Sequence, residues 1–245
     1  MKNTYKKTIA ESISYINFLS KSKKSVLTYH SINSVKNNLT SDIYQINPVN
    51  FSKHVSFLKT ESINFKTLSN FTNAEPGLLI TFDDGYKATL KSIYDLLNNK
   101  IPVVLFICPK FLKLNSINYL NLFNIRELLK SNLVEIGSHS YNHVPLTSCS
   151  QNELINELVN SKNWLEDNLS VEIKSISYPF GKINDQVEEF TKRAGYKYGF
   201  TTKFNSIDEI KNLYRIPRID IWSHDTIMNF KSKIDGKWNW LKYFT

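Results

Sequence analysis

Short runs of apolar residues recur along the chain, and each is bounded by polar or turn-forming residues. The runs that predict strands are SVLTY 25–29, LLITF 78–82, PVVLFIC 102–108, LVEIG 133–137, KSISY 174–178 and YGFTT 198–202. They are nearly continuous rather than alternating, which is typical of strands that are covered on both faces.

Helical periodicity fills the segments between these runs. Three sets of residues are spaced to share one helical face: Phe51, Val55 and Leu58; Leu90, Ile93 and Leu97; and Leu154, Leu158 and Leu165. The alternation of strands and helices predicts βαβ units and a parallel sheet with helices outside. We therefore expect one α/β barrel or barrel-like sheet, a fold that chains of 245 residues often adopt.

Charge is distributed unevenly over a composition that is ordinary for a globular protein, with 41% hydrophobic and 22% charged residues. The net charge of +9 comes from the two ends, because residues 1–40 hold seven Lys against one Glu and residues 226–245 hold four Lys against one Asp. Basic ends are typical of a solvated surface, or of contact with an anionic membrane or an anionic carrier. The basic residues avoid the centre and form no nucleic-acid-binding motif, so a nucleic-acid partner is not expected.

Polar residues follow several of the predicted strands, where α/β folds carry their chemistry. Tyr29-His30 follows the first strand, Asp83-Asp84 the second, and Pro179-Phe180-Gly181 the fifth. Two adjacent carboxylates at the end of a buried strand are costly unless each is paired or bound to a metal.

His139 and His143 lie four residues apart, directly after the predicted strand 133–137. On one helical turn their imidazoles would share a face and could hold one metal ion, although two surface histidines have the same spacing. With Asp83 or Asp84 they would form a two-His, one-carboxylate site. Because neighbouring side chains on a strand point in opposite directions, we expect a turn at Gly85 to bring both aspartates toward one pocket.

These segments resemble the motifs of the metal-dependent polysaccharide deacetylases, carbohydrate esterase family 4, which share the NodB homology domain. The matching stretches are TFDDGY 81–86, HSYNH 139–143, SYPFG 177–181 and, loosely, RIPRIDIW 215–222. The resemblance implies a distorted (β/α)7 barrel. It also implies a metal-dependent hydrolase that removes an N-acyl group, acetyl or formyl, from an amino sugar of a bacterial polysaccharide or glycan precursor.

The resemblance also assigns roles to individual residues. Asp83 would be the general base, and Asp84, His139 and His143 would bind a divalent metal, usually Zn²⁺. The ion would polarise the amide carbonyl. The backbone N–H of Phe180 would help to hold the oxyanion, and an acid must protonate the leaving amine.

Two departures from the family pattern concern the residues around the base and the acid. The family's arginine before the third-motif proline is replaced by Ser175, so we expect Arg218, or alternatively Arg215, to orient Asp83. The late Leu-x-His is absent, and His224 does not match it.

The biofilm poly-N-acetylglucosamine deacetylases take their acid-side histidine from an N-terminal Tyr-His, which VLTYHSI 26–32 resembles. His30 is therefore the candidate acid, unless it only caps its strand. Asp220 and Trp222 resemble residues that support the family's site, although ordinary packing would also explain them.

We expect residues 1–24 to form a basic helical segment and residues 25–222 to form the deacetylase domain. Residues 223–245 would form a basic, aromatic tail packed on that domain. The N-terminal segment makes a poor signal peptide, so we expect a cytoplasmic protein, at the inner membrane surface if the basic ends bind lipid. A lipid- or nucleotide-linked sugar is then as suitable a substrate as a polymer. A catalytically inactive glycan-binding module and, from the two-His, one-carboxylate set, a non-haem iron oxygenase remain alternatives.

Overall fold

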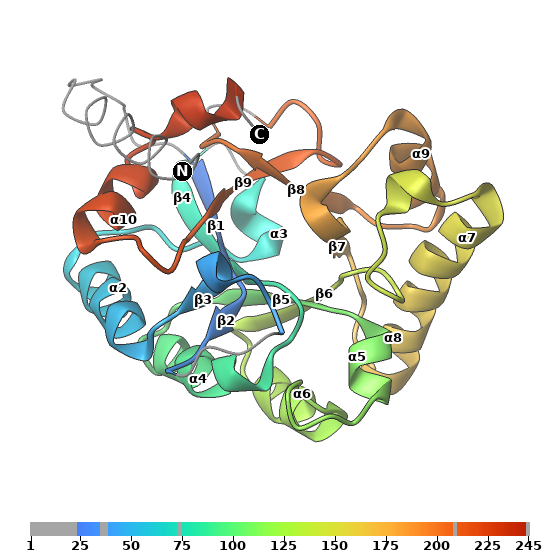
Figure 1. Ribbon diagram of the computed structural model, residues 1–245, viewed down its shortest axis with the longest axis horizontal. Helices are drawn as coiled ribbons and strands as arrows, with labels where there is room; N and C mark the ends of the chain where they lie inside the picture. The colour runs from blue at the N-terminus through green and yellow to red at the C-terminus, as the bar shows by residue number, and fades with distance from the viewer. Residues whose placement is uncertain (1–23, 35–38, 73–74, 208–209, 244–245) are drawn as a thin grey trace.

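A closed barrel of seven parallel strands forms the centre of the protein (Figure 1). The computed structural model describes residues 24–34, 39–72, 75–207 and 210–243. In barrel order the strands are β1 Lys24–Tyr29, β4 Gly77–Phe82, β5 Val103–Ile107, β6 Val134–Ser138, β7 Ser175–Ser177, β8 Tyr198–Phe204 and β9 Ile216–Asp220. This architecture confirms the predicted (β/α)7 barrel.

The register of the strands decides which residues meet at the carboxyl end of the barrel. β1 pairs with β4 along its whole length, so that Tyr29 lies beside Phe82. β9 closes the barrel on the other side of β1, where Thr28 lies beside Asp220. The residues that follow β1, β4 and β9 are therefore brought to one edge.

β9 is the barrel strand that the apolar runs did not predict. Its sequence, IPRID, contains Pro217, which cannot donate to a ladder and argues against a central strand. The strand tolerates the proline where its pairing with β8 is irregular, between Phe200 and Phe204. A separate two-stranded sheet, β2 Ser31–Ile32 with β3 Gln45–Ile46, was too short to predict.

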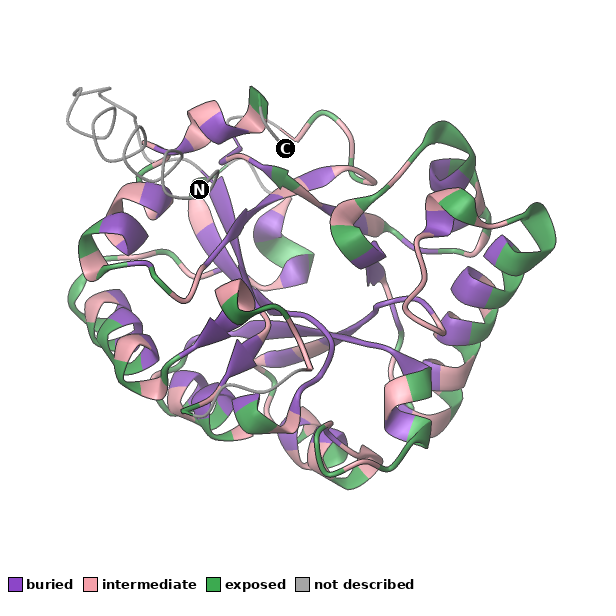
Figure 2. Ribbon diagram, viewed as in Figure 1, coloured by how far each residue is buried: buried purple, intermediate pink, exposed green. Residues whose placement is uncertain are grey.

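Helices surround the barrel, with their inner faces buried and their outer faces exposed (Figures 1 and 2). They are α2 Pro48–Thr60, α3 Leu68–Phe71, α4 Leu90–Asn98, α5 Pro109–Lys113, α6 Leu122–Leu129, α7 Gln151–Ile155, α8 Ser161–Leu169, α9 Asp185–Arg193 and α10 Ile227–Ile234. Helix α2 begins at Pro48, where the Asn47 side chain accepts from the N–H of Val49 and the proline occupies the first turn.

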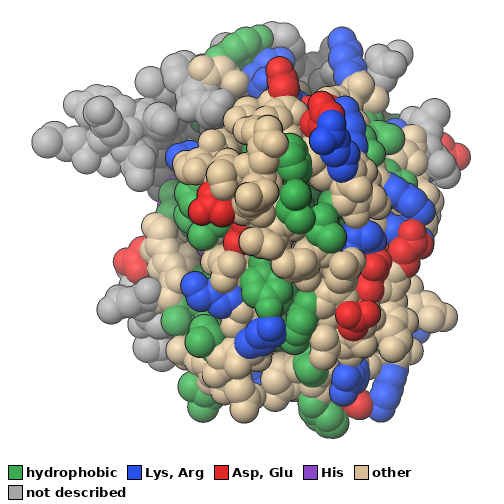
Figure 3. All heavy atoms as spheres, turned by 90° about the vertical axis from the view of Figure 1, so that its right-hand side faces the viewer, with side chains coloured by type: hydrophobic (Ala, Val, Ile, Leu, Met, Phe, Trp, Pro, Cys, Tyr) green, Lys and Arg blue, Asp and Glu red, His purple; other side chains and the backbone are tan. Residues whose placement is uncertain are grey.

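The third predicted helix consists of α7 and α8 joined by a π-helical turn, Asn156–Asn160. Its predicted core residues Leu154, Leu158 and Leu165 are buried. Figure 3 shows the face that α7, α8 and α9 cover, where acidic and basic side chains lie close together around apolar ones. Ion pairs such as Lys192–Glu188 balance this face, in keeping with the neutral centre of the chain.

The C-terminal segment packs on the barrel. Trp238 and Leu241 are buried in the main core, and Lys233 of α10 reaches inward. Residues 1–23, which make up nearly all of the expected basic helical segment 1–24, lie outside the described residues. Among the residues that are described, no helix combines the length and apolar character needed to cross a membrane.

Lys233 and Asp225 form an ion pair whose side chains are both fully buried, at 2.6 Å. Lys233→Met leaves the Asp225 carboxylate buried without its cation. It should lower the free energy of unfolding by about 3–5 kcal/mol in urea titrations. The double variant Lys233→Met/Asp225→Asn should recover most of that loss, because no charge remains to be compensated.

Lys91→Met is the control. It breaks the exposed Lys91–Asp95 pair instead and should lower the free energy of unfolding by less than about 1 kcal/mol. A similar cost for both single variants would contradict this account.

Candidate active site

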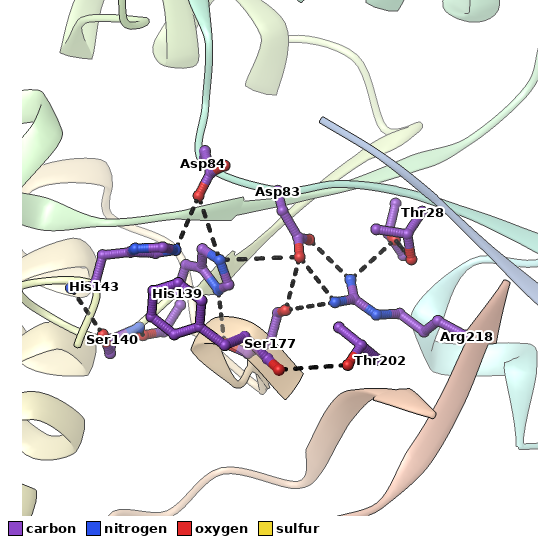
Figure 4. A network of polar contacts seen from close by, with 12 residues as sticks. Thr28, Asp83, Asp84, His139, Ser140, His143, Ser177, Thr202 and Arg218 are labelled. Atoms are coloured by element: carbon purple, nitrogen blue, oxygen red, sulfur yellow. Dashed lines mark hydrogen bonds and ion pairs between the residues drawn. The ribbon is translucent and has the colours of Figure 1, made fainter. Parts of the chain in front are cut away.

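Both aspartates of the TFDDGY motif are buried at the carboxyl end of β4. The N–H of Asp83 still donates to Tyr29 O at 2.9 Å, as a continuation of the strand pairing. The chain then reverses through Asp84 and Gly85, with φ of 67° and 69°. The expected turn at Gly85 therefore begins one residue earlier, and it points the two carboxylates into neighbouring parts of one site (Figure 4).

Arg218 of β9 donates two parallel hydrogen bonds to the Asp83 carboxylate. Nη1 donates to Oδ1 and Nη2 to Oδ2, both at 2.8 Å, and the guanidinium is completely buried. Burial raises the pKa of Asp83, but the charges of Arg218 and His139 outweigh it and lower the pKa to about 2. Asp83 is therefore a carboxylate of fixed orientation.

Arg215, the other candidate for this role, faces the surface. It pairs with Glu188 at 2.6 Å and with Asp185 at 2.5 Å, both on α9. Arg218, and not Arg215, thus contacts Asp83.

Ser177, at the end of β7, was not singled out in the sequence. Its hydroxyl donates to Asp83 Oδ2 at 3.0 Å and accepts from Arg218 Nη2 at 2.8 Å. Its carbonyl lies 2.7 Å from His139 Nδ1. Its place as the first residue of SYPFG was the available signal, but a serine has too many ordinary roles for sequence alone to select it.

Asp84, His139 and His143 converge beside this ion pair. Asp84 Oδ1 lies 3.4 Å from His139 Nε2 and 3.2 Å from His143 Nε2. His139 Nδ1 donates to the Ser177 carbonyl, so Nε2 is the ring nitrogen that faces Asp84. The His143 ring packs between Phe111 and Phe180, at centroid distances of 5.7 and 5.0 Å.

The spacing of four residues suggested that the two histidines share a helical turn, but they do not. They lie in a loop after β6 in which Ser140 and His143 both have φ of 59°. The loop aims the two Nε2 atoms at one point by turning the chain twice rather than by helical periodicity.

The residues fit a divalent metal. One ligand atom from each of Asp84, His139 and His143 lies within 4.8 Å of the others. Asp84 Oδ1 is buried and makes no hydrogen bond within the described part of the chain. An unsatisfied carboxylate oxygen beside two imidazole nitrogens is the donor set of catalytic zinc sites.

His30 and Asp220 lie at the carboxyl ends of the neighbouring strands β1 and β9. The His30 ring packs on Tyr44 at 4.4 Å. His30 Nδ1 and Asp220 Oδ1 are both buried without a hydrogen bond in the described residues. Burial raises the pKa of Asp220, and the charge of His30 opposes that shift.

Phe180 lies beside the site, and Trp222 follows Asp220 by two residues. Phe180 has φ of 59°, and its side chain is 56% exposed next to His143. The following Gly181 leaves no room for a side chain, since a Cβ there would lie 1.9 Å from Thr202 Oγ1. Trp222 packs on Trp238 and covers the Lys233 ammonium at 3.6 Å, so it supports the segment after Asp220.

The sequence profile described as polysaccharide deacetylase matches residues 72–199. The chain belongs to this family. The match includes the first three motifs and confirms the family resemblance. It also supports a hydrolase of carbohydrate esterase family 4 that removes N-acetyl groups from polysaccharide by means of a divalent metal.

Individual relatives agree with this assignment. A poly-beta-1,6-N-acetyl-D-glucosamine N-deacetylase of Staphylococcus aureus is 27% identical over 212 residues, which cover 79% of this chain and 73% of the relative. The Streptococcus pyogenes deacetylase PplD, solved in complex with acetate, has a TM-score of 0.78 at 22% identity and covers 86% of this chain and 98% of its own. IcaB from Ammonifex degensii has a TM-score of 0.74 at 19% identity and covers 89% and 99%. The two structures share the fold of this protein.

Arg218→Lys should slow turnover by about 10²-fold, because a lysine ammonium cannot replace the paired hydrogen bonds that fix Asp83. Bound metal, measured by atomic emission, should stay at the wild-type level, since Arg218 does not contact Asp84, His139 or His143. Arg215→Lys is the matched control and should leave turnover within about twofold, as expected of a surface change. Equal effects of the two variants would show that Arg218 does not orient the base.

Proposed function

We propose that this protein is a Zn²⁺-dependent N-deacetylase that acts on poly-β-1,6-N-acetylglucosamine or a closely related glycan of N-acetylated amino sugars. One observation carries the proposal: the buried Asp83 carboxylate, paired with Arg218, lies beside the cluster of Asp84, His139 and His143. Asp83 Oδ2 is 3.9 Å from His139 Nε2, so the proposed base faces the proposed metal site. The curated relatives supply the choice of polymer, since that is what their name says they act on.

In the proposed mechanism Asp84, His139 and His143 hold the ion. Bound there, zinc would supply a Lewis acid for the acetamide carbonyl and would make a water molecule more acidic. Asp83 takes the proton of the attacking water, and Arg218 and Ser177 keep its carboxylate in place while it does so. The backbone N–H of Phe180 donates to the oxyanion.

Breakdown of the tetrahedral intermediate requires an acid. The C–N bond breaks as a proton reaches the amino nitrogen, so the products are acetate and a free amine on the sugar. We assign this proton to His30, which follows β1 at the barrel edge that also carries Asp83. Asp220 would help to orient its ring by charge, since Asp220 lies on the neighbouring strand β9 and the charge of His30 lowers its pKa against the effect of burial.

The alternative of an inactive binding module loses its main support. That alternative rested on the missing third-motif arginine and on the shifted acid. Arg218 makes the contact with Asp83 that the missing arginine would make, which removes the first of these two grounds. The non-haem iron oxygenase is also disfavoured, because its scaffold is usually all-β.

The cellular setting belongs to this proposal as well. We propose a cytoplasmic protein whose basic ends contact the inner membrane surface, where a lipid- or nucleotide-linked glycan precursor would be within reach.

The first test measures acyl release by mass spectrometry. The substrates are β-1,6- and β-1,4-linked N-acetylglucosamine oligomers and nucleotide- and lipid-linked N-acetyl sugars, each with zinc-loaded and with chelator-treated protein. Asp83→Asn should lower release by about 10²–10⁴-fold, because the amide cannot accept the water proton, and should retain zinc. An active Asp83→Asn variant would exclude the assigned base. Zinc-loaded wild type that releases nothing from any substrate would exclude the proposed substrate class.

His30→Ala should slow acetyl release by a similar factor of about 10²–10⁴, because the proposed proton donor to the leaving amine is gone. Zinc content should not change. His224→Ala is the control, because His224 is exposed and lies outside the motifs. Unchanged turnover in the His30 variant would leave His30 a structural residue.

A further inference from the structure

The loop that carries both histidines depends on side chains for most of its backbone hydrogen bonds. His139 N–H donates to Ile107 O at 2.8 Å, which continues the pairing of β6 with β5. Ser140 N–H donates to Ser138 Oγ and His143 N–H to Ser140 Oγ, both at 3.1 Å. The N–H groups of residues 141 and 142 remain to be satisfied.

Glu157 satisfies both of them. Its Oε2 accepts from the N–H of Tyr141 at 3.0 Å and from the N–H of Asn142 at 2.8 Å. Its Oε1 accepts from Asn142 Nδ2 at 2.6 Å, and the residue is only 4% exposed. One buried carboxylate therefore receives three hydrogen bonds from two neighbouring residues of the histidine loop.

The other side of the loop is held as well. Tyr141 O accepts from the N–H of Lys110 at 3.1 Å and from the Cys108 thiol at 3.0 Å. The peptide groups around Tyr141 are thus fixed on both sides, and Glu157 is the charged member of the set. Ser140 and His143, on either side, both have left-handed backbone conformations. Such strained conformations persist only where surrounding contacts hold them, and these hydrogen bonds are such contacts.

The position of Glu157 in its helix is unusual too. It lies in the π-helical turn Asn156–Asn160, which interrupts the helix formed by α7 and α8. Single π-helical turns are less stable than α-helix and occur often at functional sites. Here the turn carries a buried carboxylate, and the nearby residues Leu154 and Leu158 are buried as well.

We propose that Glu157 is a positioning residue for the metal site, acting through the loop to aim His143 Nε2 at Asp84 Oδ1. It does not contact Asp84, His139 or His143 and has no role in proton transfer. The inference rests on the metal-binding role proposed for the two histidines. It extends that proposal by assigning the geometry of the second histidine to a residue of the covering helix rather than of the barrel.

Three substitutions separate positioning from stability. Glu157→Ala removes both acceptor oxygens and all three hydrogen bonds, and it leaves two backbone N–H groups unpaired. Glu157→Asp keeps the charge but withdraws it by one methylene. Glu157→Gln keeps one oxygen for both backbone N–H groups and can pair with Asn142 if that amide turns over, so it is the rescue variant.

Glu166→Ala is the matched control. Glu166 also lies on this covering helix, and its Oε1 also accepts from a backbone N–H, that of Ile173 at 2.8 Å, and from Lys162 Nζ. Its hydrogen bonds hold the segment before β7 rather than the histidine loop.

The measurements are the Zn²⁺ dissociation constant, by competition with a chromogenic chelator, the visible spectrum of the Co²⁺-substituted protein, and the urea midpoint of the metal-free protein. Glu157→Ala and Glu157→Asp should weaken zinc binding by about 10–100-fold and alter the Co²⁺ spectrum, as loss of residues that orient metal ligands does. Glu157→Gln should bind zinc within a few-fold of wild type. Glu166→Ala should lower the urea midpoint and leave zinc binding and the spectrum unchanged.

The inference is overturned if the Glu157 variants bind zinc as wild type does, or if Glu166→Ala weakens binding equally. Should Glu157→Ala fail to fold, Glu157→Asp decides alone by the same criteria. Wild-type protein that binds no zinc would overturn the proposed function and this inference together. Zinc-binding wild type with unaffected Glu157 variants would overturn this inference only.

Discussion

The structure has to hold two consecutive carboxylates, both ionised and both buried, at the end of one strand. The protein compensates them separately. Asp83 is paired with the Arg218 guanidinium, and Asp84 faces two imidazoles that would share a cation with it. The left-handed turn at Asp84 makes this separation possible, because it directs the second carboxylate away from the arginine and toward the histidine loop. Two residues with the same side chain can then serve as base and as ligand, since their surroundings differ.

The pairing of Asp83 also shows how an arginine at a different position in the sequence can play the same role of orienting the base. The family pattern has an arginine at the position of Ser175, and Ser175 is small and buried here. The guanidinium comes from β9 instead, which lies next to β1 in the closed barrel. What the base requires is a cation that donates two parallel hydrogen bonds to its carboxylate. Any strand whose side chain reaches the barrel centre can supply it, and the Ser177 hydroxyl bridges the carboxylate and the guanidinium.

The sequence predicted those parts of the molecule that local patterns encode. Continuous apolar runs located β1 and β4 to β8, and strand ends located Asp83, Asp84, His139 and His30, because chemistry in such folds sits at one edge. The parts that it missed depend on contacts between distant residues. β9 was obscured by Pro217, and the histidine loop was expected to be helical because a spacing of four residues does not reveal left-handed turns. Ser177 acts on a residue 94 positions away and Glu157 on one 16 positions away, and no local pattern distinguishes them from ordinary serines and glutamates.

Strain and its compensation are concentrated around the site. Asp84, Ser140, His143 and Phe180 all have left-handed backbone conformations, which cost on the order of 1–3 kcal/mol each for residues other than glycine. Each lies just beyond a strand, where the sheet no longer dictates the backbone. Hydrogen bonds from other elements stabilise these segments instead, since the Ser177 carbonyl orients His139, Glu157 holds the loop before His143, and the Thr202 hydroxyl donates to Phe180 O. The barrel therefore fixes where the reacting groups are, while hydrogen bonds from outside the motifs fix which way they point. Substitutions at those outside positions should consequently affect the chemistry more than the fold.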